Sequence, residues 1–247
     1  NTLVRSELIV ERGHEIGASV TPEQVEKVLV TRFQPVPTNP ATDPPARLTG
    51  TGQELLTSFV EALGVSETEY RIWLEHRLWQ DAALEHFLQS ASKTADQVFV
   101  EWIVAADSVQ AQVAFDRVAA GEPFKDVAKE LNTDSALSDE GGRVGWVPRG
   151  ALPEIEPIIF SESLGLGEPI GHHAKRLGSI VIRITDGPSE QPVTYVMRDL
   201  VAQDAFLRWV AVQAKDLTFD LSTEDIQWVL RQVSAVSYTH LTLPTKA

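Results

Sequence analysis

The chain has 247 residues, 43% of them apolar, which is enough to bury a substantial core. Its 35 acidic and 21 basic side chains give a net charge of −14 without any cluster of Lys and Arg, which excludes nucleic acid as a partner. Cysteine is absent, which excludes thiol catalysis, disulfides and zinc sites with thiolate ligands.

The first 90 residues are predicted to be helical, because apolar side chains recur there every three to four positions. The predicted helices cover residues 3–16, 22–33, 53–63 and 67–87. Thr21 with Gln24, and Ser66 with Glu69, have the spacing of capping boxes and mark two of the helix starts. Residues 34–52 hold five prolines and no apolar period, so we expect a flexible excursion there.

The fourth helix carries two tryptophans, Trp73 and Trp79, off its main apolar stripe. Two interpretations stay open for these side chains. They pack against a second neighbouring element, or they form a surface that binds another polypeptide.

The sequence period changes after residue 96. Residues 98–105 (VFVEWIVA) are β-branched and aromatic and predict a strand with Trp102 on its inner face. Two helices, a glycine-rich corner, a short helical turn and a last strand are predicted to follow, at 107–120, 124–131, 138–150, 152–160 and 178–186. His172 and His173 precede the last strand, and we expect them in a solvated loop.

This order of elements resembles a parvulin-type peptidyl-prolyl isomerase domain over residues 96–188. The matching segments are VFVEWIVA (98–105), AGEPFKDVAKELNTD (120–134), EGGRVGWVPRGALPEIEPIIF (140–160) and LGSIVIRITD (177–186). The helical part, through GASVTPEQVEKV (17–28) and LGVSETEYRIWLEHRLWQDAAL (63–84), resembles the chaperone domain of SurA/PrsA-type foldases. Residues 205–213 (AFLRWVAVQ) resemble the C-terminal helix that returns to that domain.

The resemblance implies an α+β fold in which a parvulin-like β-α-α-β-α-β domain is inserted into a helical SurA-like domain. The expected divisions are 1–95 for the N-terminal helical region, 96–188 for the parvulin-like domain and 189–236 for the returning C-terminal helices. Residues 237–247 (SYTHLTLPTKA) carry no helical period and resemble translated adapter sequence, so we expect a non-native tail.

In the parvulin pattern, two histidines and an Asp or Cys form a polar network beside an apolar pocket. Carried over, the resemblance makes Asp134 the catalytic acid, although an aspartate in NTDSA is also typical of a turn. Trp102 and Ile180 stand where the two histidines are expected, so the imidazole pair is absent.

The remaining site residues also follow from the resemblance. Leu152 occupies the aliphatic position of the pocket, and Ile155 or Phe160 is expected to contact the prolyl ring. Trp146 is expected on a strand beside the groove. We therefore predict substrate-binding roles for Trp102, Trp146, Leu152, Ile155, Phe160 and Ile180, with no metal and no cofactor.

The implied function is an extracytoplasmic folding factor that binds unfolded or extended polypeptides, including X-Pro segments, with weak or lost isomerase activity. Two alternatives stay open: an active isomerase that relies on its pocket and Asp134, and a non-catalytic scaffold of an envelope complex. The chain begins at Asn1 inside a helical pattern, so we expect an upstream leader or anchor, which would provide its membrane contact.

Overall fold

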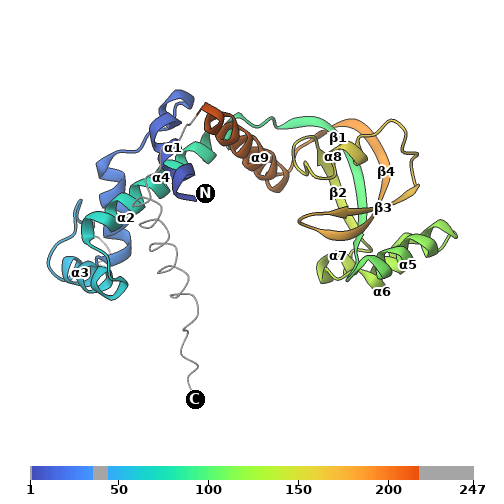
Figure 1. Cartoon of the computed structure of the whole chain (residues 1–247), viewed down its shortest axis with the longest axis horizontal. Coiled ribbons are helices and arrows are strands. Elements are labelled where there is room, and N and C mark those ends of the chain that lie inside the picture. The colour runs from blue at the N-terminus through green and yellow to red at the C-terminus, as the bar shows by residue number, and fades with distance from the viewer. Residues whose placement is uncertain (1, 36–43, 217–247) are drawn as a thin grey trace, which may run out of the picture.

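The computed structural model describes residues 2–35 and 44–216. Figure 1 shows the N-terminal helices at one end of the molecule, a sheet with its own helices at the other, and the long helix α9 (Tyr195–Gln213) between them. Residues 36–43 of the predicted excursion, residues 217–236 of the predicted C-terminal region and the predicted tail 237–247 lie outside the described residues.

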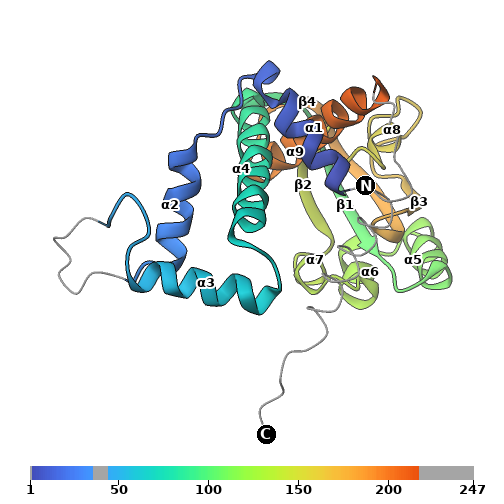
Figure 2. The ribbon, with the colours of Figure 1, turned by 60° about the vertical axis from the view of Figure 1, so that its left-hand side comes forward.

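The helical end is formed by the N-terminal part of the chain, as predicted. Its elements are α1 (Thr2–Arg12), the 3₁₀ helix η1 (Gly13–Ile16), α2 (Pro22–Phe33), α3 (Thr51–Leu63) and α4 (Glu67–Ser90). Both predicted capping boxes are present at the starts of α2 and α4. Leu29, Leu56 and Leu74 join α2, α3 and α4 in one buried apolar core. Figure 2 shows α3 lying across the lower ends of α2 and α4. Within the described residues, no helix has the length and apolar character needed to span a membrane.

The sheet end contains one more helix and one more strand than the sequence predicts. Its elements are β1 (Thr94–Val104), α5 (Ser108–Ala119), α6 (Phe124–Leu131), α7 (Ser135–Asp139), β2 (Arg143–Pro148), α8 (Glu156–Ile159), β3 (Pro169–Ala174) and β4 (Gly178–Pro192). The strands form one antiparallel sheet in the order β2-β1-β4-β3. Helix α7 and strand β3 are the additions to the predicted order.

Both faces of the sheet carry a buried core. On one face, Ile103 of β1 and Val181 of β4 pack against α5 and α6 through Ala114, Phe124 and Val127. On the other face, alternate residues of β1 and β4 pack against the α8 region. These alternate residues are Val98, Val100, Trp102, Ile180, Ile182 and Ile184. The alternation of the strands therefore separates two cores.

Helix α9 (Tyr195–Gln213), followed by the 3₁₀ helix η2 (Ala214–Asp216), contributes to both ends of the molecule. Its first half packs Met197, Leu200 and Val201 against the core that faces α8. Its second half packs Phe206, Trp209 and Val210 into the core formed with α1 and α4. Arg198 also donates a hydrogen bond from its guanidinium to the carbonyl of Leu88 in the last turns of α4 (3.0 Å). The expected return of a C-terminal helix to the N-terminal helices is thus present in α9.

The two ends are also joined by a two-stranded connection. The first residues of β1 pair with the last residues of β4, from Thr94 opposite Pro192 to Gln97 opposite Ser189. The buried Gln97 side chain donates to the carbonyl oxygens of Gln191 and Pro192 at 2.9 and 3.1 Å. Both predicted domain boundaries, after residues 95 and 188, therefore fall within paired strands, and the division itself stays a prediction.

Candidate functional site

Trp102 and Ile180 lie on neighbouring strands and on the same face of the sheet. Trp102 of β1 is paired with Ile182 of β4, and Val104 is paired with Ile180, so the two side chains are diagonal neighbours. Ile180 is 0% exposed and Trp102 is 7% exposed, and both belong to the core that faces α8. The two positions where the resemblance expects histidines are therefore filled by apolar side chains inside a closed core.

Three of the predicted pocket residues come from the segment around α8. Ile155 is fully buried in the same core as Trp102, whereas Leu152 and Phe160 are half-buried and pack against that core from its rim. A ligand can therefore reach Leu152 and Phe160, whereas Ile155 is covered and belongs to the core on which they pack.

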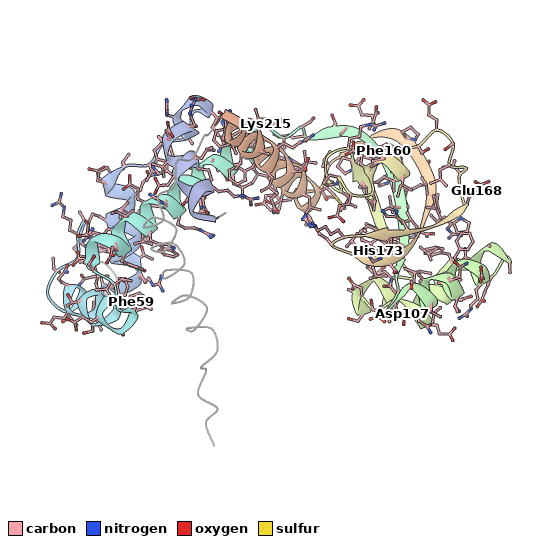
Figure 3. All side chains as sticks on the ribbon, viewed as in Figure 1. Phe59, Asp107, Phe160, Glu168, His173 and Lys215 are labelled. Atoms are coloured by element: carbon pink, nitrogen blue, oxygen red, sulfur yellow. The ribbon has the colours of Figure 1, made fainter. Side chains whose placement is uncertain are left out.

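Phe160 also borders a cavity of about 300 Å³ between α8 and α9 (Figure 3). The guanidinium of Arg149 lies over the Phe160 ring, 4.1 Å from its centroid. Glu156 accepts a hydrogen bond from the backbone N–H of Gly150 (2.6 Å) and lies 3.8 Å from Arg149. Asp204 and Arg208 of α9 form an ion pair at 2.9 Å on the opposite wall. The Phe160 ring therefore lies between the apolar core and the charged side chains that line this cavity.

The indole of Trp102 contains an unpartnered donor. Among the described residues, no acceptor lies within hydrogen-bonding distance of its buried Nε1–H. A buried donor without an acceptor costs about 1–3 kcal/mol. Of the two positions where the resemblance expects a histidine, 180 therefore carries no polar side-chain atom, and 102 carries only the indole Nε1.

The glycine-rich corner holds the α7–β2 connection against the backbone of β1. The carbonyl of Gly142 accepts from the Trp102 N–H at 2.8 Å, and Gly142 has φ +83°. A Cβ at Gly142 would lie 2.8 Å from the Trp102 carbonyl oxygen, so only glycine fits this approach. The corner therefore fixes the backbone that carries Trp102.

Asn132, which is not among the site residues predicted from the sequence, also holds this part of β1 in place. Its Nδ2 donates to the Trp102 carbonyl (3.1 Å), and its Oδ1 accepts from the N–H groups of Val104 and Asp134 (both 3.2 Å). The signal available in the sequence is an asparagine directly after a helix that ends before a turn. Asn132 brings Asp134 close to the end of β1.

Asp134 acts as the N-cap of α7. Its carboxylate accepts from the N–H groups of Ala136 and Leu137 at 3.0 and 3.3 Å, and the residue is exposed. The turn interpretation of NTDSA accounts for this geometry. The catalytic role of Asp134 stays a prediction.

Trp146 lies on a strand, β2, as expected, but the structure does not bring it together with the other predicted site residues. It is paired with Phe99 across β1 and β2, and the two rings meet edge to face at 5.4 Å. The next residue, Val147, points into the core that holds Trp102. Because side chains alternate along a strand, Trp146 points to the opposite face of the sheet.

The prediction that His172 and His173 lie in a loop is wrong, because both belong to β3. His172 is paired with Ile180 and His173 with Ser179. The His173 Nδ1 lies 3.2 Å from the Ser179 Oγ. The sheet pairing of β3 with β4 orders this segment, although its composition does not favour a strand. Over residues 2–35 and 44–216, no three His, Asp or Glu side chains gather in a way that could hold a metal ion.

Comparison with known proteins gives relatives in sequence and matches among solved structures. The foldase protein PrsA of Caldanaerobacter subterraneus subsp. tengcongensis is 28% identical over 125 residues, which cover 48% of this chain and 41% of the relative. The chaperone SurA of Pseudomonas fluorescens is 24% identical over 143 residues, or 55% of this chain and 32% of the relative. The crystal structure of the peptidylprolyl isomerase PrsA from Bacillus anthracis matches with a TM-score of 0.50 at 14% identity, covering 98% of both chains.

The chain has a PrsA-like fold. The predicted resemblance to SurA/PrsA-type foldases and the predicted α+β class are confirmed. The matched regions span about two fifths of the PrsA relative and about a third of the SurA relative. No protein-family model matches the chain.

In this PrsA-like fold, the chemistry offered by the site is mainly apolar. Leu152 and Phe160 can contact an apolar ring and remove water from the peptide group next to it. The groups that could act on that peptide group are few, because Asp134 is engaged as a helix cap and the indole N–H of Trp102 is buried.

Proposed function

We propose that the chain is an extracytoplasmic folding factor that binds unfolded polypeptides, and that its parvulin-like part has weak or no isomerase activity. Similarity to PrsA and SurA supports the first half of the proposal. We also propose that the bound polypeptides include segments with X-Pro bonds, because Leu152 and Phe160 offer an apolar contact for a prolyl ring.

The observation that carries the second half is the closed core around Trp102 and Ile180. Rotation about an X-Pro bond must pass a barrier of about 20 kcal/mol, because the amide loses its resonance. A catalyst lowers that barrier with polar groups aimed at the twisted amide. An alkyl side chain at 180 offers no such group, and the indole at 102 offers a single donor that is covered.

The binding of unfolded chains is supported by an apolar surface on the helical end. Leu55, Phe59 and Leu63 follow one another at four-residue spacing along α3, so they share one side of the helix. Leu55 and Leu63 are exposed, and Phe59 reaches Tyr70 of α4 with 5.5 Å between ring centroids. Trp73 stacks on Tyr70 and is 55% exposed. We call Leu55, Phe59, Leu63 and Trp73 the α3–α4 apolar surface. A connected apolar patch on a protein surface is typical of a binding site.

Trp79, the second tryptophan left open by the sequence, has a different environment. It is half-buried, packs with Leu8, Ile9 and Ala83, and covers Gly13, where an added Cβ would lie 2.9 Å from the indole. Trp79 therefore serves the packing of α1 on α4, and Trp73 is the tryptophan available to a client.

Light scattering by a chemically unfolded test protein, such as citrate synthase, tests the binding of unfolded chains. We expect the chain to delay aggregation at a near-equimolar ratio, and we expect Trp73→Ala combined with Leu63→Ala to weaken this effect several-fold. The matched control is Val212→Ala on α9, which removes a similarly exposed apolar side chain outside the surface. Unchanged aggregation in the presence of the wild-type chain would contradict the proposal, and it would favour the scaffold alternative.

A protease-coupled proline isomerisation assay tests the second half. We expect a rate close to the uncatalysed background over a range of X-Pro peptides. A rate far above background would contradict the proposed loss of catalysis.

The unpartnered N–H of Trp102 favours a second candidate, a slow isomerase that uses this donor together with the apolar pocket. Under this candidate, Trp102→Phe and Leu152→Ala each lower the residual rate at least several-fold. Asp134→Ala lowers the rate as well if the carboxylate takes part, whereas an unchanged rate in all three variants rules this candidate out.

A further inference from the structure

A cavity of about 250 Å³ lies between α5 and the edge of the sheet, on the face opposite to the Trp102 core. Its walls include Ala111, Gln112 and Phe115 of α5, Gly171 and His173 of β3, and Ser179 of β4. Figure 3 shows His173 on β3 and Asp107 at the start of α5, which mark the two elements that border it. Of the site residues predicted from the sequence, only Ile180 lines this cavity, and its side chain belongs to the core on the other face of the sheet.

One of the strand positions that line the cavity, Gly171, carries no side chain. Gly171 is paired with Val181 of β4, which is fully buried under α5 and α6. A Cβ added at Gly171 would meet no atom within 4 Å, and its backbone has no positive φ. A glycine inside a strand often marks a place where another backbone or ligand approaches closely. An edge glycine is also covered well by a large side chain from the strand beside it.

The strand that carries Gly171 has a free edge. β3 is the outermost strand of the sheet and pairs with β4 alone among the described strands. The outward backbone N–H and C=O groups of such a strand are available to an added strand. An extended peptide that pairs there would place alternate side chains over the α5 face. One of them would stand beside Gly171 and enter the cavity.

The end of β3 differs in charge from the rest of the chain. Residues 172–176 (HHAKR) hold one lysine, one arginine, two histidines and no acidic side chain, in a chain of net charge −14. Lys175 is exposed and makes no ion pair within the described residues. The Glu154 carboxylate serves Arg176, whose backbone N–H donates to it at 3.1 Å and whose guanidinium lies 3.9 Å from it, so Lys175 is the cation left for a ligand. The carboxylate of Asp107 is engaged in capping α5, where it accepts from the Gln110 N–H at 2.8 Å. This end of the strand therefore complements an acidic segment.

We propose that β3 binds an extended segment of an unfolded client by strand addition, with a large apolar side chain in the cavity over Gly171 and an acidic residue beside Lys175. The proposal rests on the proposed function, because it assumes that unfolded polypeptides are the ligands. It adds a second binding place, on the opposite face of the sheet from Leu152 and on the opposite end of the molecule from the α3–α4 apolar surface.

The test uses the whole chain and a labelled nine-residue peptide of valine and threonine, with a central leucine and an aspartate at each end. Each aspartate is four residues from the leucine, which is the spacing of Lys175 from Gly171 along the chain. Fluorescence anisotropy gives the Kd, and backbone amide shifts give the place of binding. We expect amide shifts in β3 and α5. We also expect Gly171→Val to raise the Kd at least tenfold, because its side chain fills the cavity from within. Val212→Ala on α9 is the control, since it removes an exposed apolar side chain that belongs to neither β3 nor α5, and it should leave the Kd unchanged.

Two further measurements do not depend on the folding of the Gly171 variant. A peptide N-methylated at alternate residues cannot pair with β3 through those groups, and we expect the wild-type chain to bind it at least tenfold more weakly. Lys175→Glu should weaken the aspartate peptide several-fold and strengthen a matched peptide with lysines in place of aspartates. Equal binding of the methylated peptide, or amide shifts confined to α3, α4 or the Leu152 pocket, would overturn strand addition.

The aggregation assay separates this inference from the proposed function. If Gly171→Val binds the peptide normally while the wild-type chain delays aggregation, strand addition at β3 is wrong and the folding-factor function stands. If the wild-type chain neither delays aggregation nor binds the peptide, both proposals are wrong.

Discussion

The replacement of Ile180 by histidine tests whether the core beside Trp102 is closed to polar groups. Ile180 is fully buried among apolar side chains. The loss of its buried aliphatic surface costs about 1.5–3 kcal/mol. The burial of an imidazole without a hydrogen-bond partner costs about a further 1–3 kcal/mol. We therefore expect Ile180→His to lower the free energy of unfolding by about 2.5–6 kcal/mol at pH 8.

The assay is urea unfolding followed by circular dichroism, with Ile180→Val as the matched control. The control keeps the site apolar and should cost about 0.5–1.5 kcal/mol. A buried imidazole has a pKa below its unfolded value of about 6.5, because desolvation disfavours the charged form. The cost of Ile180→His should therefore increase as the pH falls from 8 to 5, while the cost of Ile180→Val should not.

A cost below about 1 kcal/mol that does not change with pH would refute this reasoning. It would mean that the imidazole finds polar partners, so that a polar network still exists around position 180. In that case the isomerase assay should be repeated on the variant, because a restored histidine would then stand in a site able to use it.

Three other predictions follow from contacts away from this core. Asp134→Ala should lower the free energy of unfolding by about 0.5–2 kcal/mol through the loss of the α7 cap, while Asp134→Asn should change it by less; equal losses in urea unfolding would contradict the capping role. Gln97→Leu takes the donor from two carbonyl groups of β4, a loss of about 1–3 kcal/mol, but it also removes the buried Gln97 Oε1, which has no partner among the described residues; we therefore expect a net cost near the lower end of that range, and a cost above about 3 kcal/mol would contradict this balance. Arg117 lowers the pKa of the Glu122 carboxyl by hydrogen bonding, so the pair stabilises the fold above the unfolded pKa of Glu122 and loses its effect as the pH falls through the lower folded pKa. Arg117→Gln should therefore lower the Tm at pH 7 and have a smaller effect near pH 3, and a pH-independent difference would contradict this linkage.

Local signals in the sequence were sufficient to predict most helices. The capping boxes at Thr21 and Ser66 specify helix starts through hydrogen bonds within four residues, and both occur in the structure. Gly64 ends α3 in the left-handed conformation for an equally local reason. Residues whose structure depends on their immediate neighbours are therefore predicted well.

The two elements missed in the sheet end depend on distant residues. β3 (Pro169–Ala174) contains a proline, a glycine and two histidines, none of which indicates a strand. It is a strand because β4 offers its backbone for pairing. α7 (Ser135–Asp139) is too short to show an apolar period, and its start is defined by the side chain of Asp134.

The candidate site was predicted in part for the same reason. Strand alternation places Trp102 and Ile180 on inner faces, and the structure brings them together with Leu152, Ile155 and Phe160. The face to which Trp146 points depends on the register between β1 and β2, which no local pattern in its segment specifies. Sequence alone could not separate it from the others.

The position of α9 in two cores has a consequence for how the molecule comes apart. Met197 and Leu200 complete one core and Phe206 and Val210 complete the other, so melting of this single helix uncovers apolar surface in both. The two ends should therefore unfold together in one cooperative transition and not as two independent domains. A fragment that ends at residue 192 would lack α9. The apolar surface that Met197 and Leu200 cover would then be exposed, so the fragment should be prone to self-association.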